Sequence, residues 1–338
     1  MAKKQMSDKR VTIRDVALAA QVSIGTVSRA LKGQPGLSDQ TRAEVLQVAG
    51  RLGYDLGKLR SIKPQRILFL YARRPDYSPT TNPFYSLVLH GAESACREAG
   101  VSLSLSSVHG DDDVAAQVRR HDPDALIGMG FLEPETLTAL QSCELPLVLT
   151  DHHHPALHSI NDDNLTGALL ATRHLLETGA QRPALIVGPM SHQSVALRAK
   201  GFRRALFEAG RLADPDLEVE LSAALSYDEA GRDAMRRLLA LPQRPDAVFA
   251  YNDATALNAM AVCLERGLRV PEDIRFVGYD DIADAARSQP PLSTVRVDKE
   301  ALGREAVNAL MQGLTTPGDT LLAVDLILRE SSAPHRGR

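Results

Sequence analysis

The sequence predicts a small all-α head at the N-terminus, joined to a larger α/β body built on parallel sheets. Its 338 residues are enough for two or three domains. Residues 1–66 carry 13 Lys/Arg against 5 Asp/Glu, whereas the rest of the chain carries 26 against 37. Up to residue 54 the patterns are helical only, and beyond residue 66 short apolar runs alternate with amphipathic helices.

The composition is that of an ordinary globular protein, with 44% hydrophobic and 24% charged residues. No run approaches membrane-spanning length, and residues 1–10 lead into no apolar signal core. We therefore expect a cytoplasmic protein without a membrane partner. Cys96, Cys143 and Cys263 are far apart and lack CxxC spacing, which indicates reduced packing residues rather than disulfides or a zinc site.

The charge is divided unequally, with a net of +8 in residues 1–66 and −11 in the remainder. A basic head on an acidic body is typical of a protein that contacts phosphates at one end only. Charge alone leaves a solvated basic tail as an alternative.

Helix signals in residues 10–54 predict a head of three short helices. The first lies over 15–20, behind a capping box that begins at Thr12. The second begins after Ser23, and the third spans 38–52. Each helix has an apolar stripe, so the three can close a minimal core.

The second helix has two contrasting faces. Val27, Ala30 and Leu31 form an apolar stripe at i, i+3 and i+4 spacing. The opposite stripe suits a helix in the DNA major groove, and its arginine is the best candidate to contact a base or a phosphate. Charge on an exposed helix face is also common for solvation alone, which leaves that alternative open. The stripe consists of Gly25, Ser28, Arg29 and Lys32.

The string TIRDVALAAQVSIGTVSRALKGQPGLSDQTRAEVLQVAGRLGY, residues 12–54, resembles the helix-turn-helix head of the lactose/galactose-repressor (LacI) family. This resemblance implies a transcription regulator, expected to be a repressor, that binds double-stranded operator DNA as a homodimer. It places Ile24, Gly25 and Arg29 at operator-reading positions. Because Gly25 has no side chain, we expect weak base discrimination there. The positions that match phosphate contacts are Thr12, Ser23, Thr26 and Ser28.

The segment 55–65 is the expected hinge, and here the resemblance is weakest. The sequence DLGKLRSIKPQR lacks the Pro-Asn and Ala-Arg pairs that family members usually carry, and it is about one turn short. A single turn around Leu59 could still form on DNA and place this side chain in the minor groove. A flexible tether is the alternative.

The body, residues 66–332, alternates strands with helices, which predicts parallel sheets with right-handed crossovers. Helices are expected over about 83–99, 163–178 and 253–266, each ended by a glycine. The expected strands are 67–72, 101–106, 124–129, 145–150, 183–188, 246–251 and 275–280.

The body resembles the two-lobed, periplasmic-binding-protein-like (type I) sensor of the same family. The expected first lobe covers about 66–160 and 291–318, and the second about 161–290 and 319–332. The matching motifs are NPFYSLVLHGAE (82–93), the pair Asp163-Asn164, LRAKGFRRAL (197–206), AYNDATALNAM (250–260), VGYDDI (277–282) and PPLSTVRVD (290–298).

Asp151, Asn252 and Asp280 directly follow apolar runs, and ligands of parallel sheets collect at the carboxyl ends of strands. Asn252 and Asp280 could instead cap the elements that follow them. The resemblance implies that an effector contacts Phe84, Tyr85, Arg198, Asn252 and Asp280, and Asp151, Asp163 and Ser226 complete the candidate set.

A carboxylate, an amide and a guanidinium near aromatic rings suit a sugar, which is the first expectation for the effector, and a nucleobase or nucleoside is the second. Ser226 stands where many sugar-sensing members carry an aromatic platform, which weakens the ring-stacking argument. The tract His152, His153 and His154 is interpreted as a pocket-rim loop, since adjacent side chains diverge and metals need convergent ligands.

The sequence contains no GxxxxGK[ST], HExxH or GxSxG motif, so we expect neither catalysis nor a cofactor. A sugar-binding transport receptor shares the body fold, but it would require a signal peptide and has no use for the head. An enzyme of sugar metabolism is a third alternative. The tail 331–338 is too short for tetramer-forming heptads, which favours a dimer.

Overall fold

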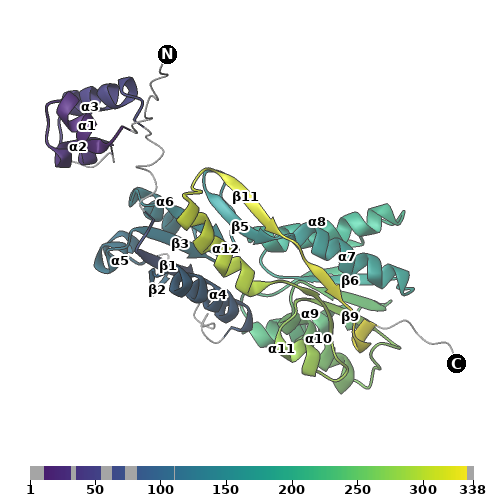
Figure 1. Ribbon diagram of the computed structural model, residues 1–338. Coiled ribbons are helices and arrows are strands. Elements are labelled where there is room, and N and C mark those ends of the chain that lie inside the picture. Colours follow the sequence, from purple (N-terminus) through teal and green to yellow (C-terminus); the bar gives the residue numbers. More distant parts are fainter. Residues whose placement is uncertain (1–10, 32–35, 55–62, 73–81, 110, 333–338) are drawn as a thin grey trace, which may run out of the picture. The chain divides into compact units, whose positions relative to one another are not determined.

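The computed structural model describes residues 11–31, 36–54, 63–72, 82–109 and 111–332 (Figure 1). The chain divides into a head that ends at Lys63 and a body that begins at Pro64. Within the described residues, no helix has the length and apolar character needed to cross a membrane.

The head consists of three helices, as the sequence predicts: α1 (Ile13–Ala19), α2 (Ile24–Leu31) and α3 (Asp39–Arg51). The Asp15 carboxylate accepts hydrogen bonds from the Thr12 backbone N–H and hydroxyl, both at 2.7 Å. The core of the head is fully buried at three valines, one from each helix: Val16, Val27 and Val45.

The body contains two six-stranded sheets, one in each lobe. The first has the order β11-β5-β4-β3-β1-β2, and all its pairs are parallel. Its strands are β1 (Arg66–Ala72), β2 (Ser102–Val108), β3 (Ala125–Met129), β4 (Leu147–Thr150), β5 (His158–Asp162) and β11 (Gly318–Leu322).

The second sheet has the order β12-β10-β9-β8-β6-β7, and its one antiparallel pair is β10 with β12. The prediction of parallel sheets is confirmed. Its strands are β6 (Pro183–Val187), β7 (Glu218–Glu220), β8 (Ala247–Ala250), β9 (Arg275–Asp280), β10 (Ser293–Arg296) and β12 (Asp325–Ile327).

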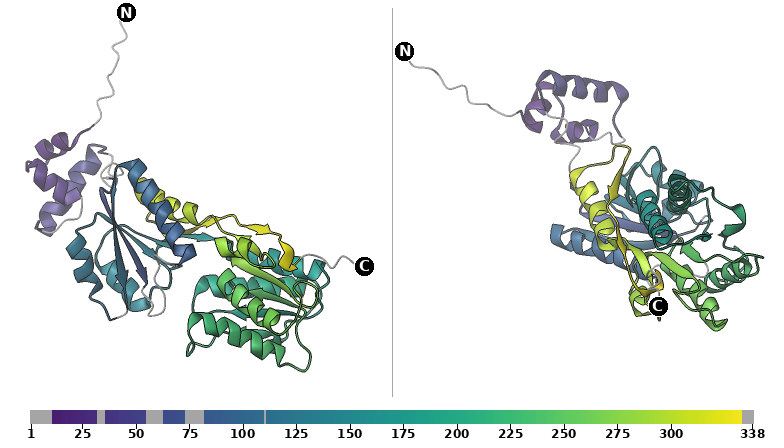
Figure 2. Two further views of the ribbon diagram at one scale, coloured as in Figure 1. Left: turned by 90° about the horizontal axis from the view of Figure 1, so that it is seen from below. Right: turned by 90° about the vertical axis from the view of Figure 1, so that its right-hand side faces the viewer.

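Helices pack on both sheets, and the chain passes between the lobes through β5–α7, β10–α12 and β11–β12 (Figures 1 and 2). Helices of the first lobe are α4 (Pro83–Ala99), α5 (Val114–His121), α6 (Pro134–Ser142) and α12 (Lys299–Gln312). Those of the second are α7 (Asn164–Glu177), α8 (Gln193–Glu208), α9 (Tyr227–Leu239), α10 (Asp253–Glu265) and α11 (Ala283–Arg287).

The last two passages of the chain between the lobes lie at other residues than the sequence predicts. Strand β10 continues the second sheet beside β9, so the first lobe does not resume at residue 291. Strand β11 pairs with β5 in the first sheet, so that lobe extends to Leu322 rather than to residue 318. Both strands are short and half-polar, and such strands lack the apolar run by which the others are recognised.

Candidate functional site

The Arg198 guanidinium of α8 lies at the centre of a buried polar cluster in the body. Its side chain is held from three directions, and the residue is only 5% exposed. Nε donates to Asn164 Oδ1 at 2.6 Å, and Nη1 donates to the Tyr251 carbonyl oxygen at 2.6 Å. The guanidinium stacks on the Tyr279 ring, 3.6 Å from its centroid. The orientation of Arg198 is therefore fixed before any ligand arrives.

Two carboxylates flank this guanidinium. Asp280 Oδ1 lies 3.4 Å from Arg198 Nη1, and Asp162 Oδ2 lies 3.8 Å from Nη2. The Tyr279 hydroxyl donates to Asp162 Oδ2 at 2.8 Å. Burial raises the pKa of Asp280 to about 7, although the charges of Arg198 and Lys299 oppose this rise. Burial also raises the pKa of Asp162.

The turn that carries Asp280 has a strained backbone. Asp280 ends β9 and Asp281 follows it, with φ of 108° and 52°, in the left-handed region that favours glycine. The Lys299 ammonium donates to the carbonyl oxygens of Asp280, Asp281 and Val297. These contacts hold the Asp280 carboxylate beside Arg198.

Asp151, directly after β4, connects the two lobes. Its Oδ2 accepts from the Tyr85 hydroxyl of the first lobe at 3.0 Å, and its Oδ1 accepts from the Ser194 hydroxyl of the second lobe at 3.0 Å. The residue is 7% exposed, and His192 Nε2 lies 3.9 Å from Oδ2. A buried carboxylate thus holds α8 of the second lobe against the first.

Aromatic rings lie next to this contact. Phe84 is buried and packs edge-to-face on Tyr85, with ring centroids 5.4 Å apart. Phe131 lies 5.9 Å from the His192 ring, and His152 lies 6.5 Å from the same ring. Burial lowers the pKa of His152 to about 4, so this imidazole is neutral at pH 7.

The three adjacent histidines do not converge. His153 Nδ1 lies 2.9 Å from Asp319 Oδ1, whereas His154 Nδ1 accepts from the Ala156 backbone N–H at 3.3 Å. His152 packs against His192 instead. Over the part of the chain that the structure describes, no group of three or more His, Cys, Asp or Glu side chains is arranged to hold a metal ion.

Three predicted effector residues act as helix caps in this structure. Asp163 accepts from the Thr166 backbone N–H at 3.0 Å at the start of α7, and the exposed Ser226 accepts from Glu229 N–H at 3.4 Å at the start of α9. Asn252 Oδ1 caps α10 at 3.0 Å, and its Nδ2 donates to the Tyr227 hydroxyl. Asn252 therefore caps a helix, as the alternative predicted, and also contacts Tyr227. The Asp280 carboxylate instead accepts a hydrogen bond from Arg198 Nη1.

Sequence reasoning missed four contributors: Asp162, Ser194, His192 and Tyr279. Asp162 ends β5, a strand with no apolar run, so the sequence does not mark it as the carboxyl end of a strand. Tyr279 lies within the apolar run of β9, and its position directly before Asp280 is the signal that could identify it.

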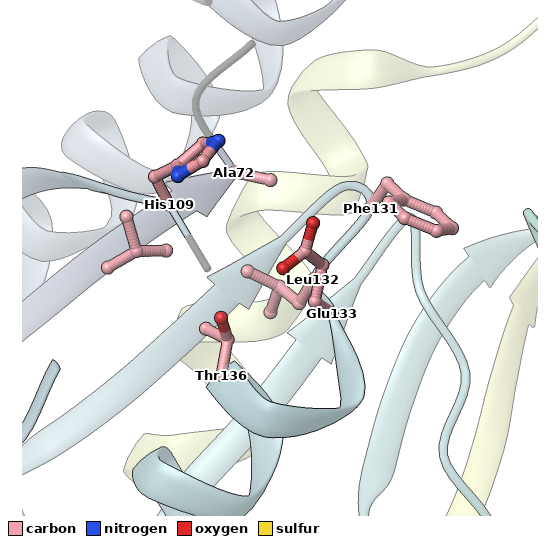
Figure 3. Close-up of a pocket in the computed structure, with 7 residues that line it drawn as sticks. Ala72, His109, Phe131, Leu132, Glu133 and Thr136 are labelled. Carbon is pink, nitrogen blue, oxygen red and sulfur yellow. The ribbon is translucent and has the colours of Figure 1, made fainter. Parts of the chain in front are cut away.

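A small pocket lies at the carboxyl ends of the first-lobe strands (Figure 3). Its volume of about 20 Å³ has room for one water molecule. It is lined by Ala72, Val108, His109, Phe131, Leu132, Glu133 and Thr136. The pocket is too small for a sugar-sized effector.

On the head, the predicted DNA-contacting face of α2 is open. Ile24, Gly25 and Arg29 are exposed, and Arg29 Nε donates to the Gly25 carbonyl oxygen at 3.4 Å. Ser23 Oγ caps α2 by accepting from the Thr26 backbone N–H at 3.0 Å, and the two hydroxyls lie 2.8 Å apart. The Ser28 side chain, Lys32 and Leu59 lie outside the described residues.

The raised pKa of Asp280 predicts pH-dependent stability. An aspartate in an unfolded chain ionises near pH 4, so between about pH 4 and 7 the folded state holds more protons at Asp280. The stability from this group is complete below pH 4 and is lost as the pH rises to 7, by at most about 1.4 kcal/mol per pH unit. Asp280→Asn should remove this dependence.

The measurement is urea unfolding at pH 5 and pH 7. The stability of Asp280→Asn relative to the parent should rise by about 1–3 kcal/mol between the two values. The exposed Asp325→Asn is the control and should follow the parent. If the free energy of unfolding changes with pH in the same way in Asp280→Asn and the parent, the raised pKa of Asp280 is refuted.

A helix-turn-helix head followed by a two-lobed α/β body with a buried polar cluster defines the class of ligand-responsive DNA-binding regulators. Residues 12–55 match the bacterial regulatory proteins of the lacI family, and residues 172–332 match the periplasmic binding protein-like domain. The chain is 34% identical to the ribose operon repressor of Escherichia coli (strain K12), over 90% of this chain and 94% of that protein. It is 32% identical to the HTH-type transcriptional repressor CytR of the same strain, over 98% of each.

Solved structures agree. A transcriptional regulator CelR–cellobiose complex aligns with a TM-score of 0.72 and 29% identity, over 95% of this chain and 100% of that one. The lac repressor dimer bound to operator and the anti-inducer ONPF aligns with a TM-score of 0.69 and 28% identity, over 96% and 99%. The chain therefore belongs to the LacI family of bacterial regulatory proteins, as its sequence motifs predict.

Proposed function

We propose that this protein is a transcription repressor whose affinity for operator DNA is controlled by a small polar effector bound between the lobes. The observation that carries the proposal is Arg198, a buried guanidinium fixed by Asn164 and Tyr251 and flanked by two carboxylates. This cluster binds the polar effector through charge-assisted hydrogen bonds, which are strong and directional where water is excluded.

The effector contacts are Arg198 and Asp280 from the second lobe, with Asp151, Phe84 and Tyr85 from the first. Asp151 supports this assignment because it already bonds to both lobes, at Tyr85 and Ser194. An effector that replaces either contact changes how the lobes close. In a homodimer, closure changes the separation of the two heads on a two-fold symmetric operator.

On the head, Ile24, Gly25 and Arg29 read bases, and Thr12, Ser23, Thr26, Ser28 and Lys32 bind phosphates. Leu59 enters the minor groove when the hinge orders on DNA. The relatives named as repressors support a regulator rather than an enzyme, and the binding of operator DNA supports a cytoplasmic location. Light scattering should give the mass of two chains, and a one-chain mass would contradict the dimer.

The effector is expected to be a sugar or sugar derivative. The relatives named as the ribose operon repressor and the CelR–cellobiose complex favour carbohydrate. The relatives named PurR and CytR, 30% and 32% identical, favour a nucleobase or nucleoside as the second candidate.

A thermal-shift screen of the full chain against sugars, sugar phosphates, nucleosides and nucleobases tests this proposal. A ligand at about 100 times its Kd adds about 2.7 kcal/mol to the free energy of unfolding. We expect a sugar or sugar derivative to raise the Tm of the parent but not of Arg198→Ala. A hit retained in Arg198→Ala would move the effector site elsewhere, and a nucleobase hit alone would favour the second candidate.

A further inference from the structure

Two carboxylates, Asp162 and Asp280, flank the Arg198 guanidinium of the proposed effector site, and the charge of a third, Asp151, also raises the pKa of Arg198. Asp151, Asp162 and Asp280 follow or end β4, β5 and β9, and their exposed fractions are 7%, 1% and 8%. Each of the three contributes to the electrostatic environment of Arg198. Even with the Lys299 ammonium counted, the cluster holds one more carboxylate than cations.

The neighbouring acidic groups are paired within the protein. Asp281 forms ion pairs with Arg296 at 2.7 Å and Arg329 at 2.6 Å. Asp253 accepts from the Thr294 hydroxyl at Oδ1 and from the Ile282 backbone N–H at Oδ2. The carboxyl groups in excess over cations are therefore those near Arg198, and burial opposes the ionisation of Asp162 and Asp280 by raising the pKa of each.

Asp162 adds an independent observation. Its Oδ2 accepts from the Tyr279 hydroxyl at 2.8 Å, whereas its Oδ1 is buried without a hydrogen-bond partner among the described residues. Buried carboxylate oxygens are normally satisfied, and an unsatisfied one needs an explanation. Asp162 ends β5 where the chain leaves the first lobe, and its Oδ2 lies 3.8 Å from Arg198 Nη2, so this carboxylate borders the proposed effector site.

Building on the proposed function, we infer that the effector is a polyhydroxylated amine of the amino-sugar class, with its ammonium bound between Asp162 and Asp280. An ammonium has three N–H donors, which can satisfy Asp162 Oδ1 and the second carboxylate together. Its charge also favours the ionised forms of Asp162 and Asp280, which burial opposes, whereas the hydroxyl of a neutral sugar satisfies an oxygen without supplying charge. Arg198 then donates to a ring hydroxyl.

The test compares matched ligands: glucosamine with glucose, galactosamine with galactose, and mannosamine with mannose. Binding to the full chain is measured by thermal shift and then by calorimetry at pH 7. At least one amino sugar should bind at least tenfold more tightly than its neutral partner. In Asp162→Asn, which keeps the shape but removes the charge, this preference should fall below threefold.

Asp325→Asn removes the same charge from an exposed position and should keep the preference. Equal or tighter binding of the neutral sugars, no binding of any amino sugar, or an unchanged preference in Asp162→Asn would overturn the inference. A neutral sugar that binds and alters operator affinity would overturn the inference while leaving the proposed function intact. Failure of the full chain to bind any selected DNA duplex would instead overturn the proposed function.

Discussion

Arg198→Ala is expected to abolish the response of operator binding to the effector while leaving DNA binding itself in place. The substitution removes the donors to Asn164 Oδ1 and to the Tyr251 carbonyl oxygen. It also leaves Asp162 and Asp280 buried beside each other without their counterion. Breaking a buried ion pair from one side costs about 3–5 kcal/mol of stability, so the Tm of the body should fall as well.

A second variant separates the loss of effector binding from the loss of folding stability. Arg198→Lys keeps the positive charge but loses the planar fork that reaches two acceptors, so effector affinity should fall at least tenfold in a folded protein. Arg203→Ala is the matched control on the same helix, because Arg203 is half-exposed and pairs only with Glu218 in the described structure. A full effector response in Arg198→Lys would show that guanidinium geometry is not what binds the effector.

Arg29→Ala is expected to abolish specific operator recognition. Arg29 is exposed on α2, the second helix of the helix-turn-helix. An arginine that donates twice to a guanine contributes about 1–3 kcal/mol of discrimination, and a dimer uses it at two half-sites. The loss should therefore be about thirtyfold or more in operator affinity.

The operator is first selected from random duplexes with the full-length protein, and its Kd is then measured by fluorescence anisotropy. Arg51→Ala, on the exposed face of α3, removes the same charge from the head and should weaken all duplexes equally. Effector binding to the body should be unchanged in both variants. An unchanged operator Kd for Arg29→Ala would refute the recognition-helix assignment.

The sequence predicted the head and the long strands well, because both are encoded locally. The three head helices have caps and apolar stripes, and Ser23 and Asp15 make the hydrogen bonds that their positions indicate. The apolar runs of the body are strands of parallel sheets, as alternation with helices requires, and all of them except the edge strand β2 are largely buried.

Strand β5 could not be predicted because its burial depends on tertiary partners. Strand β5 reads HSIND, yet Ser159, Asn161 and Asp162 are almost fully buried. Polar residues of this kind indicate a loop unless the neighbouring strand and the opposite lobe are known. For the same reason the sequence does not single out Asp162, which is polar and ends a polar strand, whereas it does single out Asp280, which ends an apolar one.

The candidate site was predicted in outline from the ends of strands and from the family resemblance. Arg198 and Asp280 lie in one set of contacts with Asp162 and Tyr279. Asp151 and Tyr85 lie in a second set with Ser194, which precedes Arg198 by one turn of α8. Ser226 and Asp163 were predicted with them, but their side chains cap α9 and α7. A capping residue and a ligand-binding residue look alike in sequence, since both are polar and both follow a strand.

The most direct test of the account is the operator Kd of the full-length protein, measured with and without the ligand that raises its Tm. We expect a change of about 5- to 150-fold in the parent, which corresponds to a coupling free energy of about 1–3 kcal/mol, and no change in Arg198→Ala. A ligand that binds the body of the parent at saturation and leaves the operator Kd unchanged would contradict it.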